Sequence, residues 1–312
     1  MPRAPVMKPT ATRRLPAPMR VARKGERGSS RVYVGDCRDL LSKIPEVKAG
    51  AVDLVFADPP FNWSRAYDEW HDKMPREEYL EFTRGWLDLC ARGLREGGAF
   101  WVNIPDDTVA EIVLHLKSIG LRMINWCVWH YRFGQNTKSR FINSKVHALY
   151  FVKPNANGNV DIGAREDGGR TWHPERVLET SDRRAIYGDP RTESKRDGMP
   201  AGKRVPMDVW YGEYWGRVQG NNKERREYHD NQLPEVYLER VILSCTEPGD
   251  TVLDPFTGSG TTGVVACDYG RDFIGTEFSE ANATNATKRI KAGMVRKGLV
   301  VDASTAIHPK RR

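Results

Sequence analysis

A stiff segment that carries reactive side chains covers residues 57–63, which read Ala-Asp-Pro-Pro-Phe-Asn-Trp. It follows residues 51–56, Ala-Val-Asp-Leu-Val-Phe, a run typical of a parallel strand that is buried on both faces. The two prolines fix the backbone and remove two N–H donors, so the hydrogen bonding of a sheet interior stops there. An acid and an aromatic ring are thus held at a strand end, although such prolines also occur as simple strand terminators.

A second segment with chemical potential, residues 252–265, reads VLDPFTGSGTTGVV. The expected strand ends at Asp254, Gly258 and Gly260 allow a tight turn, and a helix is expected to begin near Thr261. In such a context backbone N–H groups and a helix N-terminus face a bound ligand. The segment has no P-loop lysine and no GxGxxG spacing, which disfavours ATP and NAD. Glycine turns of this kind also occur without any ligand.

Glu277 ends the next expected strand, DFIGTEF, about twenty residues beyond the glycine turn. Nucleotide-binding sites place a carboxylate for the ribose hydroxyls at this distance. The alternative is that Glu277 caps the helix that follows.

Taken together, DPPF and FTGSGTT resemble the motifs of the S-adenosylmethionine-dependent DNA amino-methyltransferases. The resemblance extends from about residue 32 to residue 292 and includes VGDCRDLL, LREGGAFWVNI and NQLPEVYLERVI. The catalytic motif precedes the cofactor motif, as in the β group of this family, whose fold is circularly permuted. The resemblance implies an α/β fold with an open, mostly parallel, Rossmann-like methyltransferase sheet and an inserted, irregular target-recognition region.

This resemblance gives the first segment a catalytic role. Asp58 and the carbonyl of Pro59 would accept hydrogen bonds from the amino group of the target base, which favours a nitrogen whose lone pair can attack the methyl donor. Pro60 would stiffen the segment, and Phe61 would stack on a base flipped out of the duplex. Phe stands at position 61 where Tyr is commoner in the family, so a tyrosine hydroxyl contact is excluded.

The resemblance assigns a further set of residues to the cofactor S-adenosyl-L-methionine. Phe256, Thr257, Gly258 and Gly260 would surround its methionine end and sulfonium, with Asp254 before them and Thr261 at the helix entrance. Glu277 would hold the ribose, and Gln232 would lie near the methionine carboxylate. Asp36 would accept from the adenine amino group, although it could equally be a turn acid or a helix cap before Cys37.

An acid at position 58 resembles the adenine-N6 enzymes of the family, whereas serine is typical of the cytosine-N4 enzymes. The sequence therefore favours a site-specific adenine-N6 methyltransferase of double-stranded DNA, with cytosine-N4 methylation as the alternative. C5-cytosine methylation is excluded because it needs a cysteine after proline, and the chain has no Pro-Cys dipeptide. RNA and protein-glutamine methyltransferases usually carry the cofactor loop first. A catalytically silent DNA-binding regulator is opposed by the intact Asp58, Phe61, Gly258 and Gly260.

Strand and helix patterns alternate from residue 32 onward, and the apolar spacing predicts a helix over residues 75–96 that Gly97 and Gly98 end. Residues 154–230 break this rhythm and are too long and irregular for a simple connection. We therefore expect a catalytic half over 32–153, a target-recognition region over 154–230, a cofactor-binding half over 231–292 and a C-terminal tail over 293–312.

Positive charge is concentrated before residue 32. Residues 1–31 hold nine Lys and Arg against one acid, a net charge of +8 that equals the formal charge of all 312 residues. This proline-rich arm is predicted to be disordered, either as a solubilising extension or as a tether that binds DNA phosphates. Residues 130–145 interleave aromatic with basic side chains and are predicted to contact DNA through Arg132, Lys138, Arg140 and Lys145.

The remaining composition restricts the setting. Five scattered cysteines without a CxxC pair indicate reduced thiols in a cytoplasmic protein and argue against a structural zinc site, so no metal is expected. The apolar stretches are too short to span a membrane, so no membrane partner is expected. A homodimer and a cognate restriction endonuclease stay open as further partners.

Overall fold

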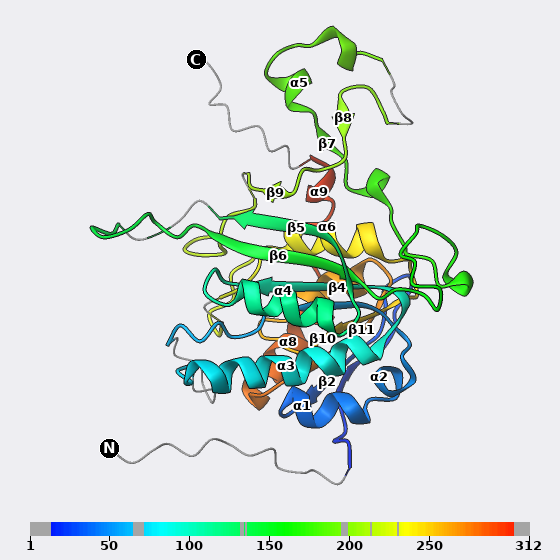
Figure 1. The fold of residues 1–312 in the computed structure, drawn as a ribbon, viewed down its shortest axis with the longest axis vertical. Helices are drawn as coiled ribbons and strands as arrows, with labels where there is room; N and C mark the ends of the chain where they lie inside the picture. The colour runs from blue at the N-terminus through cyan, green and yellow to red at the C-terminus, as the bar shows by residue number, and fades with distance from the viewer. Residues whose placement is uncertain are drawn as a thin grey trace.

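The computed structural model describes residues 14–64, 72–131, 134, 136–194, 199–212, 214–229 and 231–302 (Figure 1). Within these residues, no helix has the length and apolar character that crossing a membrane requires. The predicted DNA-contacting residue Arg132 lies outside them.

A central sheet organises the described chain, with the strand order β1-β2-β11-β10-β3-β4-β6-β5-β9. The strands are β1 Met19–Val21, β2 Ser30–Val34, β3 Val52–Ala57, β4 Leu94–Ile104, β5 Arg122–His130, β6 Lys145–Val152, β9 Val209–Trp210, β10 Thr251–Asp254 and β11 Asp272–Glu277. Strands β2, β11, β10, β3 and β4 are parallel to their neighbours, whereas β6 runs antiparallel to β4 and β5. The predicted mostly parallel α/β sheet is confirmed, and its circular permutation stays a prediction.

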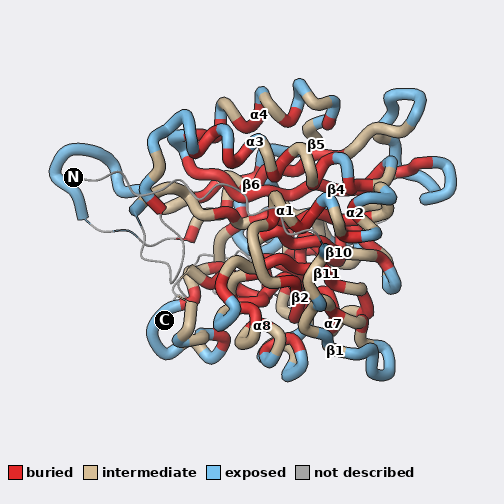
Figure 2. The backbone as a smooth tube through the Cα atoms, turned by 90° about the horizontal axis from the view of Figure 1, so that it is seen from below, coloured by how far each residue is buried: buried red, intermediate tan, exposed pale blue. Residues whose placement is uncertain are grey.

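Helices cover both faces of the sheet, so its strands are the most buried part of the chain (Figures 1 and 2). One face packs against α1 Cys37–Leu40, α2 Pro45–Ala49, α3 Arg76–Gly93 and α4 Val109–Ser118, and the other against α6 Glu235–Cys245, α7 Thr261–Asp268 and α8 Glu280–Ala292. Strand β3 feeds both cores, because Leu54 and Phe56 join the α6 side while Val55 and Ala57 join the α3 side. This double burial explains the near-continuous apolar run that precedes Asp58.

Helix α3 ends earlier than the apolar spacing predicted. It stops at Gly93, and residues 94–98 belong to β4 instead. Leu94 is wholly buried opposite Val52 of β3, and the Arg95 Nε atom lies 2.6 Å from Asp53 Oδ1. Sheet pairing and this ion pair therefore override the helical pattern over the last three residues.

The prediction of a disordered arm over residues 1–31 is wrong for residues 14–31, and residues 1–13 lie outside the described part. Strand β1 pairs antiparallel with β2 at the edge of the sheet. Arg27 bonds Asp268 at 2.6 Å and the Ile290 carbonyl at 2.6 Å, and Arg23 bonds Asp272 at 2.8 Å. The positive charge of this segment is thus used on acids of the cofactor half, which lie some 240 residues away along the chain.

Residues 154–230, here called the insertion, are mostly irregular as predicted. Their short elements are β7 Glu179–Thr180, β8 Lys203–Arg204, α5 Asp182–Ala185 and several 3₁₀ turns, and the part around α5 and β8 projects from the body (Figure 1). The end of the insertion nevertheless enters the core, because β9 pairs with β5 and Trp215 is wholly buried. After α8, the tail returns over α6 as α9 Leu299–Asp302, where Glu239 accepts bonds from the Gly298 and Val300 amides.

Gly28→Ala tests whether the arm is part of the folded domain. The Gly28 amide donates to the Cys267 carbonyl at 2.8 Å, and an added Cβ would lie 1.7 Å from the Arg271 carbonyl oxygen. We expect the substitution to lower the free energy of unfolding by about 1–3 kcal/mol, the usual cost of overpacking. Urea unfolding measures this change.

The matched control is Gly85→Ala on α3, where the new Cβ meets only the Arg38 Cδ atom at an ordinary 3.7 Å. Alanine also favours a helix interior, so this variant should be at least as stable as the wild type. Equal stability of the two variants would show that the arm is not docked.

Candidate active site

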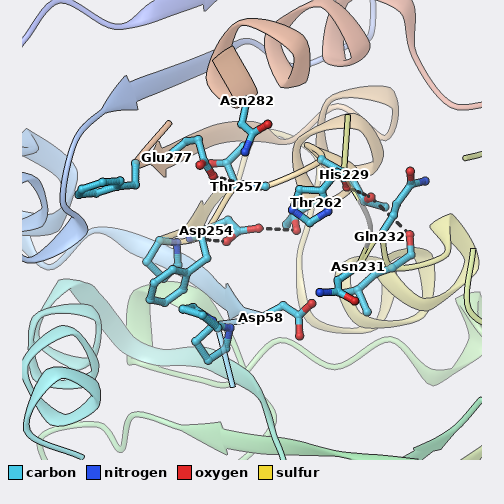
Figure 3. Close-up of a pocket in the computed structure, with 18 of the residues that line it drawn as sticks. Asp58, His229, Asn231, Gln232, Asp254, Thr257, Thr262, Glu277 and Asn282 are labelled. Carbon is cyan, nitrogen blue, oxygen red and sulfur yellow. Dashed lines mark hydrogen bonds between the residues drawn. The ribbon is translucent and has the colours of Figure 1, made fainter. Parts of the chain in front are cut away.

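One pocket opens at the carboxyl ends of β3, β10 and β11, the usual ligand position in an open parallel sheet (Figure 3). It brings together nearly all the predicted catalytic and cofactor residues: Asp36, Asp58, Pro59, Pro60, Phe61, Gln232, Asp254, Phe256, Thr257, Gly258, Thr261 and Glu277. The exception is Gly260, which faces α8 instead, where an added Cβ would lie 3.0 Å from the Ala286 Cβ.

Asp58 is held by a chain of hydrogen bonds that crosses the sheet. The Asn103 amide of β4 donates to Asp58 Oδ1 at 3.0 Å, and the Tyr237 hydroxyl of α6 donates to Asn103 Oδ1 at 2.6 Å. Asp58 keeps partial exposure to the pocket, but desolvation by the surrounding protein raises its pKa to about 6, against the lowering effects of Asn103 and the Arg217 charge. The carboxylate therefore has a fixed direction and free acceptor capacity.

The backbone after Asp58 is fixed at several points. The Tyr79 hydroxyl donates to the Pro60 carbonyl at 3.0 Å, whereas no described residue donates to the Pro59 carbonyl. Asn62 adopts a φ of 60°, and its side chain exchanges two hydrogen bonds with the Met74 backbone. The segment thus leaves the Pro59 carbonyl available, as the predicted second acceptor requires.

Phe61 lines the pocket beside Trp63, with the two rings in edge contact at 5.2 Å between centroids. Both aromatic rings sit on the stiff segment that Asn62 anchors. Such rings offer apolar faces on which an unstacked base can lie.

Asp254 fixes the loop after β10. It is 2 % exposed, and it accepts from the Phe256 amide at 2.8 Å and from the Thr262 hydroxyl at 2.6 Å. Burial, together with the charges of Asp58 and Glu277, raises its pKa to about 7 despite these two bonds. Both oxygens thus serve the loop, and the direct cofactor contact assigned to Asp254 stays a prediction.

The glycine turn brings its backbone close to neighbouring groups. Gly258 has a φ of 49°, and a Cβ there would lie 2.8 Å from His229 Nε2. Gly260 has a φ of 80° and forms the N-cap of α7. Thr257, in the same loop, is 4 % exposed and its hydroxyl has no hydrogen-bond partner among the described residues. A buried, unsatisfied donor beside an open turn indicates a site for a polar ligand.

A buried ion pair supports this loop from below. The Arg289 guanidinium of α8 donates to the Ser259 carbonyl at 3.2 Å and the Thr261 hydroxyl at 2.8 Å, and lies 3.1 Å from Glu235 of α6. Glu235 also accepts from the Val295 amide at 2.9 Å. Helices α6 and α8 and the C-terminal tail are thereby tied to the start of α7.

Glu277 connects the glycine turn with the start of α8. Its carboxylate accepts from the Gly258 amide at 2.8 Å and from the Ser279 amide at 3.1 Å. The cap of α8 itself comes from the Ser279 hydroxyl, which accepts from the Asn282 amide at 3.2 Å, so simple capping does not explain Glu277. Burial raises the pKa of this carboxyl. Ribose binding by Glu277 stays a prediction.

Asp36 and Gln232 are both engaged within the protein. Asp36 caps α1 by accepting from the Arg38 amide at 2.8 Å and forms an ion pair with the same arginine at 2.6 Å, so the capping alternative is confirmed. Gln232 donates to the Glu224 carbonyl at 2.7 Å and accepts from the Arg226 amide at 3.1 Å. Gln232 therefore fixes the end of the insertion, and the cofactor contacts of both residues stay predictions.

The described residues of the predicted DNA-contacting loop lie outside the pocket, on the hairpin that joins β5 and β6 (Figure 1). Lys138 and Arg140 are exposed, as phosphate contacts require. Lys145 is paired with Asp106, which also accepts from His147 at 2.6 Å. Lys145 must give up part of this pairing before it binds a phosphate.

Several pocket residues carried no signal that sequence analysis used. They are Asn103 and Tyr237, which support Asp58, and Arg217, His229 and Asn231, which line the pocket. Asn103 was identifiable as the one polar residue inside the apolar stretch AFWVNI. The others come from the irregular insertion or from distant helices, where spacing gives no guide.

Comparison with known proteins identifies the family. The family model described as "DNA methylase" (N6_N4_Mtase) matches residues 52–288. The chain belongs to this family. The resemblance drawn from DPPF and FTGSGTT is thereby confirmed.

The curated relatives include the Type II methyltransferases M.BamHI of Bacillus amyloliquefaciens and M.BglII of Bacillus subtilis. The chain is 33% identical to M.BamHI over 80% of its own length and 54% of that protein. It is 33% identical to M.BglII over 80% of its own length and 66% of that protein. The chain thus spans just over half of the first relative and 66% of the second.

Solved structures share the fold at low sequence identity. The M1.HpyAVI–SAM complex matches with a TM-score of 0.56 and 20% identity, covering 84% of this chain and 98% of that chain. The PvuII DNA methyltransferase, titled cytosine-N4-specific, matches with a TM-score of 0.53 and 18% identity, covering 88% and 97%. These matches confirm the fold class.

Tyr237→Phe tests the chain of bonds behind Asp58. The substitution removes the hydroxyl that bonds the buried Asn103 oxygen at 2.6 Å and leaves that oxygen without its donor. We expect a loss of about 1–3 kcal/mol in the free energy of unfolding, the cost of an unsatisfied buried acceptor. Urea unfolding gives the value.

The control is Tyr187→Phe in the insertion, where the side chain is 77% exposed and its hydroxyl can bond water in either state. This variant should match the wild type. If Tyr237→Phe is equally stable, the hydroxyl does not orient Asn103.

Proposed function

We propose that this chain transfers a methyl group from S-adenosylmethionine to an exocyclic amino group of a base in DNA. The observation that carries the proposal is the convergence of the Asp58 segment and the glycine turn on one pocket, at the ends of the adjacent strands β3 and β10. Membership of the DNA methylase family supports it.

The pocket residues fit the methyl donor. Its positive sulfonium suits a pocket lined by Asp36, Asp58, Asp254 and Glu277, and the buried Thr257 hydroxyl offers an unused polar contact. Phe256, packed edge-on against Trp86 at 5.0 Å, supplies a fixed apolar wall. Thr257, Gly258 and Glu277 would hold the donor, which supplies an electrophilic methyl group when it is bound.

The residues on the acceptor side prepare the amino nitrogen. Its lone pair is delocalised into the base, and acceptors on both amino hydrogens favour a pyramidal nitrogen with a localised pair. Asp58 supplies one acceptor, aimed by Asn103, and the unoccupied Pro59 carbonyl supplies the other. Positive charge develops on the nitrogen during transfer, and the fixed Asp58 carboxylate stabilises it. The target atom is inaccessible within a duplex, so the base is flipped out and stacks on Phe61.

We infer adenine-N6 as the acceptor in double-stranded DNA, because the residue before Pro59 is an acid. The alternative is cytosine-N4, which the PvuII structure names as its own specificity. The name Type II methyltransferase borne by both curated relatives supports a role in restriction–modification, with a cognate endonuclease as partner. We propose action in the cytoplasm of a bacterial or phage-infected cell, where such DNA lies. A homodimer stays a prediction.

Asp58→Ala should abolish most methyl transfer while leaving the fold and cofactor binding intact. Loss of one positioned electrostatic contact in a transition state commonly lowers the rate about 10²–10³-fold. Asp58→Asn keeps a carbonyl acceptor of the same shape and should retain more activity than the alanine variant. The measurement is single-turnover transfer of labelled methyl from S-adenosylmethionine to unmethylated plasmid DNA.

Digestion of the product DNA separates N6-methyladenine from N4-methylcytosine, and sequencing of the methylated plasmid locates the modified sequence. Wild-type turnover in Asp58→Ala would refute the catalytic role of the carboxylate. A product containing only N4-methylcytosine would refute the adenine assignment alone, and no transfer by the wild type would refute the proposed function.

Glu277→Gln should weaken S-adenosylmethionine binding by about tenfold or more, because charge-assisted hydrogen bonds are lost to the ligand and to the glycine turn. Equilibrium titration of the protein with S-adenosylmethionine measures the change. The control is Glu280→Gln in the first turn of α8, an exposed acid three residues further along. Equal affinity in both variants would mean that Glu277 makes no contact with the cofactor.

A further inference from the structure

Arg217 is a permanently charged cation among the described residues that line the pocket. Its guanidinium lies 4.2 Å from the centre of the Tyr131 ring. Within the described chain it forms no ion pair and donates no hydrogen bond, even though acids line the same pocket. Arginines in this protein are commonly paired with acids, as Arg27, Arg38 and Arg289 are, so a free guanidinium in the pocket is an exception that calls for a ligand.

The backbone that carries Arg217 is fixed on both sides. Trp215 is wholly buried, its carbonyl accepts from Trp129 Nε1 at 2.6 Å, and the Arg240 guanidinium lies 4.2 Å from its ring centre. Val218 is 3% exposed. Arg217 itself is half-buried, so its guanidinium is accessible from the pocket and is held flat by Tyr131. A pre-positioned planar guanidinium loses little entropy when it binds an anion.

The chemistry of the pocket indicates which anion. Asp58 and Phe61 take the amino group and the face of the base, and both lie in the pocket with Arg217. A nucleotide that is rotated out of a duplex brings its own phosphates with it to the entrance of the pocket. Guanidinium and phosphate form charge-assisted, often paired, hydrogen bonds.

We propose that Arg217 binds a phosphate adjacent to the flipped target nucleotide and so holds that nucleotide in the pocket. This inference rests on the proposed function. It gives the insertion a direct contact with the extruded nucleotide, in addition to any contact with the surrounding sequence.

Arg217→Gln tests the contact on a duplex that carries the sequence located by plasmid sequencing. We expect about tenfold weaker binding, and a plot of log affinity against log salt that is less steep by about one unit, the effect of one lost phosphate contact. Arg217→Lys keeps the charge and should restore the salt slope. The control, Arg92→Gln, removes an exposed arginine at the end of α3, on the opposite edge of the sheet, and should change neither value.

A second arm identifies the phosphate. Replacing either phosphate that flanks the target nucleotide by an uncharged methylphosphonate should weaken wild-type binding at one of the two positions. Arg217→Gln should show no further loss at that position. Equal, additive losses in the variant and the wild type at both positions would overturn the proposal.

Two other results would also overturn it. An unchanged salt slope, with a pH–rate profile displaced to higher pH, would mean that Arg217 acts on Asp58 and not on a phosphate. Weaker S-adenosylmethionine binding by Arg217→Gln would place Arg217 at the cofactor instead. Transfer by the wild type in the plasmid assay separates these outcomes from failure of the proposed function.

Discussion

The gathering of three carboxylates at the ends of adjacent strands constrains the whole site. Asp58, Asp254 and Glu277 follow β3, β10 and β11, which are neighbours in the sheet. Burial and mutual repulsion raise the pKa of each of these carboxyls, so each must be stabilised locally if it is to stay charged. Asn103, Thr262 and the amides of Phe256 and Gly258 supply that stabilisation. A cationic ligand would complete it, and this is the physical reason why the pocket suits a sulfonium.

The sequence was sufficient to locate the chemistry because both motifs are local. Prolines after Asp58 and glycines after Asp254 each end a buried strand, and parallel strands place their carboxyl ends at one edge. The contact between β3 and β10 then brings the two motifs together. The supporting residues could not be located in this way, because the bond between Tyr237 and Asn103 joins residues 134 positions apart. Such a contact depends on how α6 packs on the sheet, and no local pattern records it.

The arm shows the opposite failure, in which composition was informative but misread. Nine basic residues and many prolines before residue 32 are typical of disorder when they are considered alone. Their acidic partners, Asp268 and Asp272, lie at the other end of the chain. Net charge over a window cannot reveal such pairing. The same limit applied to α3, whose last predicted turn became part of β4 because Leu94 and Arg95 have partners on β3 and the preceding loop.

The insertion is joined to the active site more closely than a separate recognition module would be. Its end supplies Trp215 to the core, Arg217 and Val218 to the pocket, and the Glu224 carboxylate to the Glu235 amide at the start of α6. Glu235 in turn pairs with Arg289, which bonds the loop before α7. One continuous set of hydrogen bonds therefore connects the insertion to the glycine turn. Because a displacement at one end would disturb buried charges at the other, DNA bound by the insertion and a cofactor held by the turn would be energetically coupled. This coupling would favour methyl transfer only when both are in place.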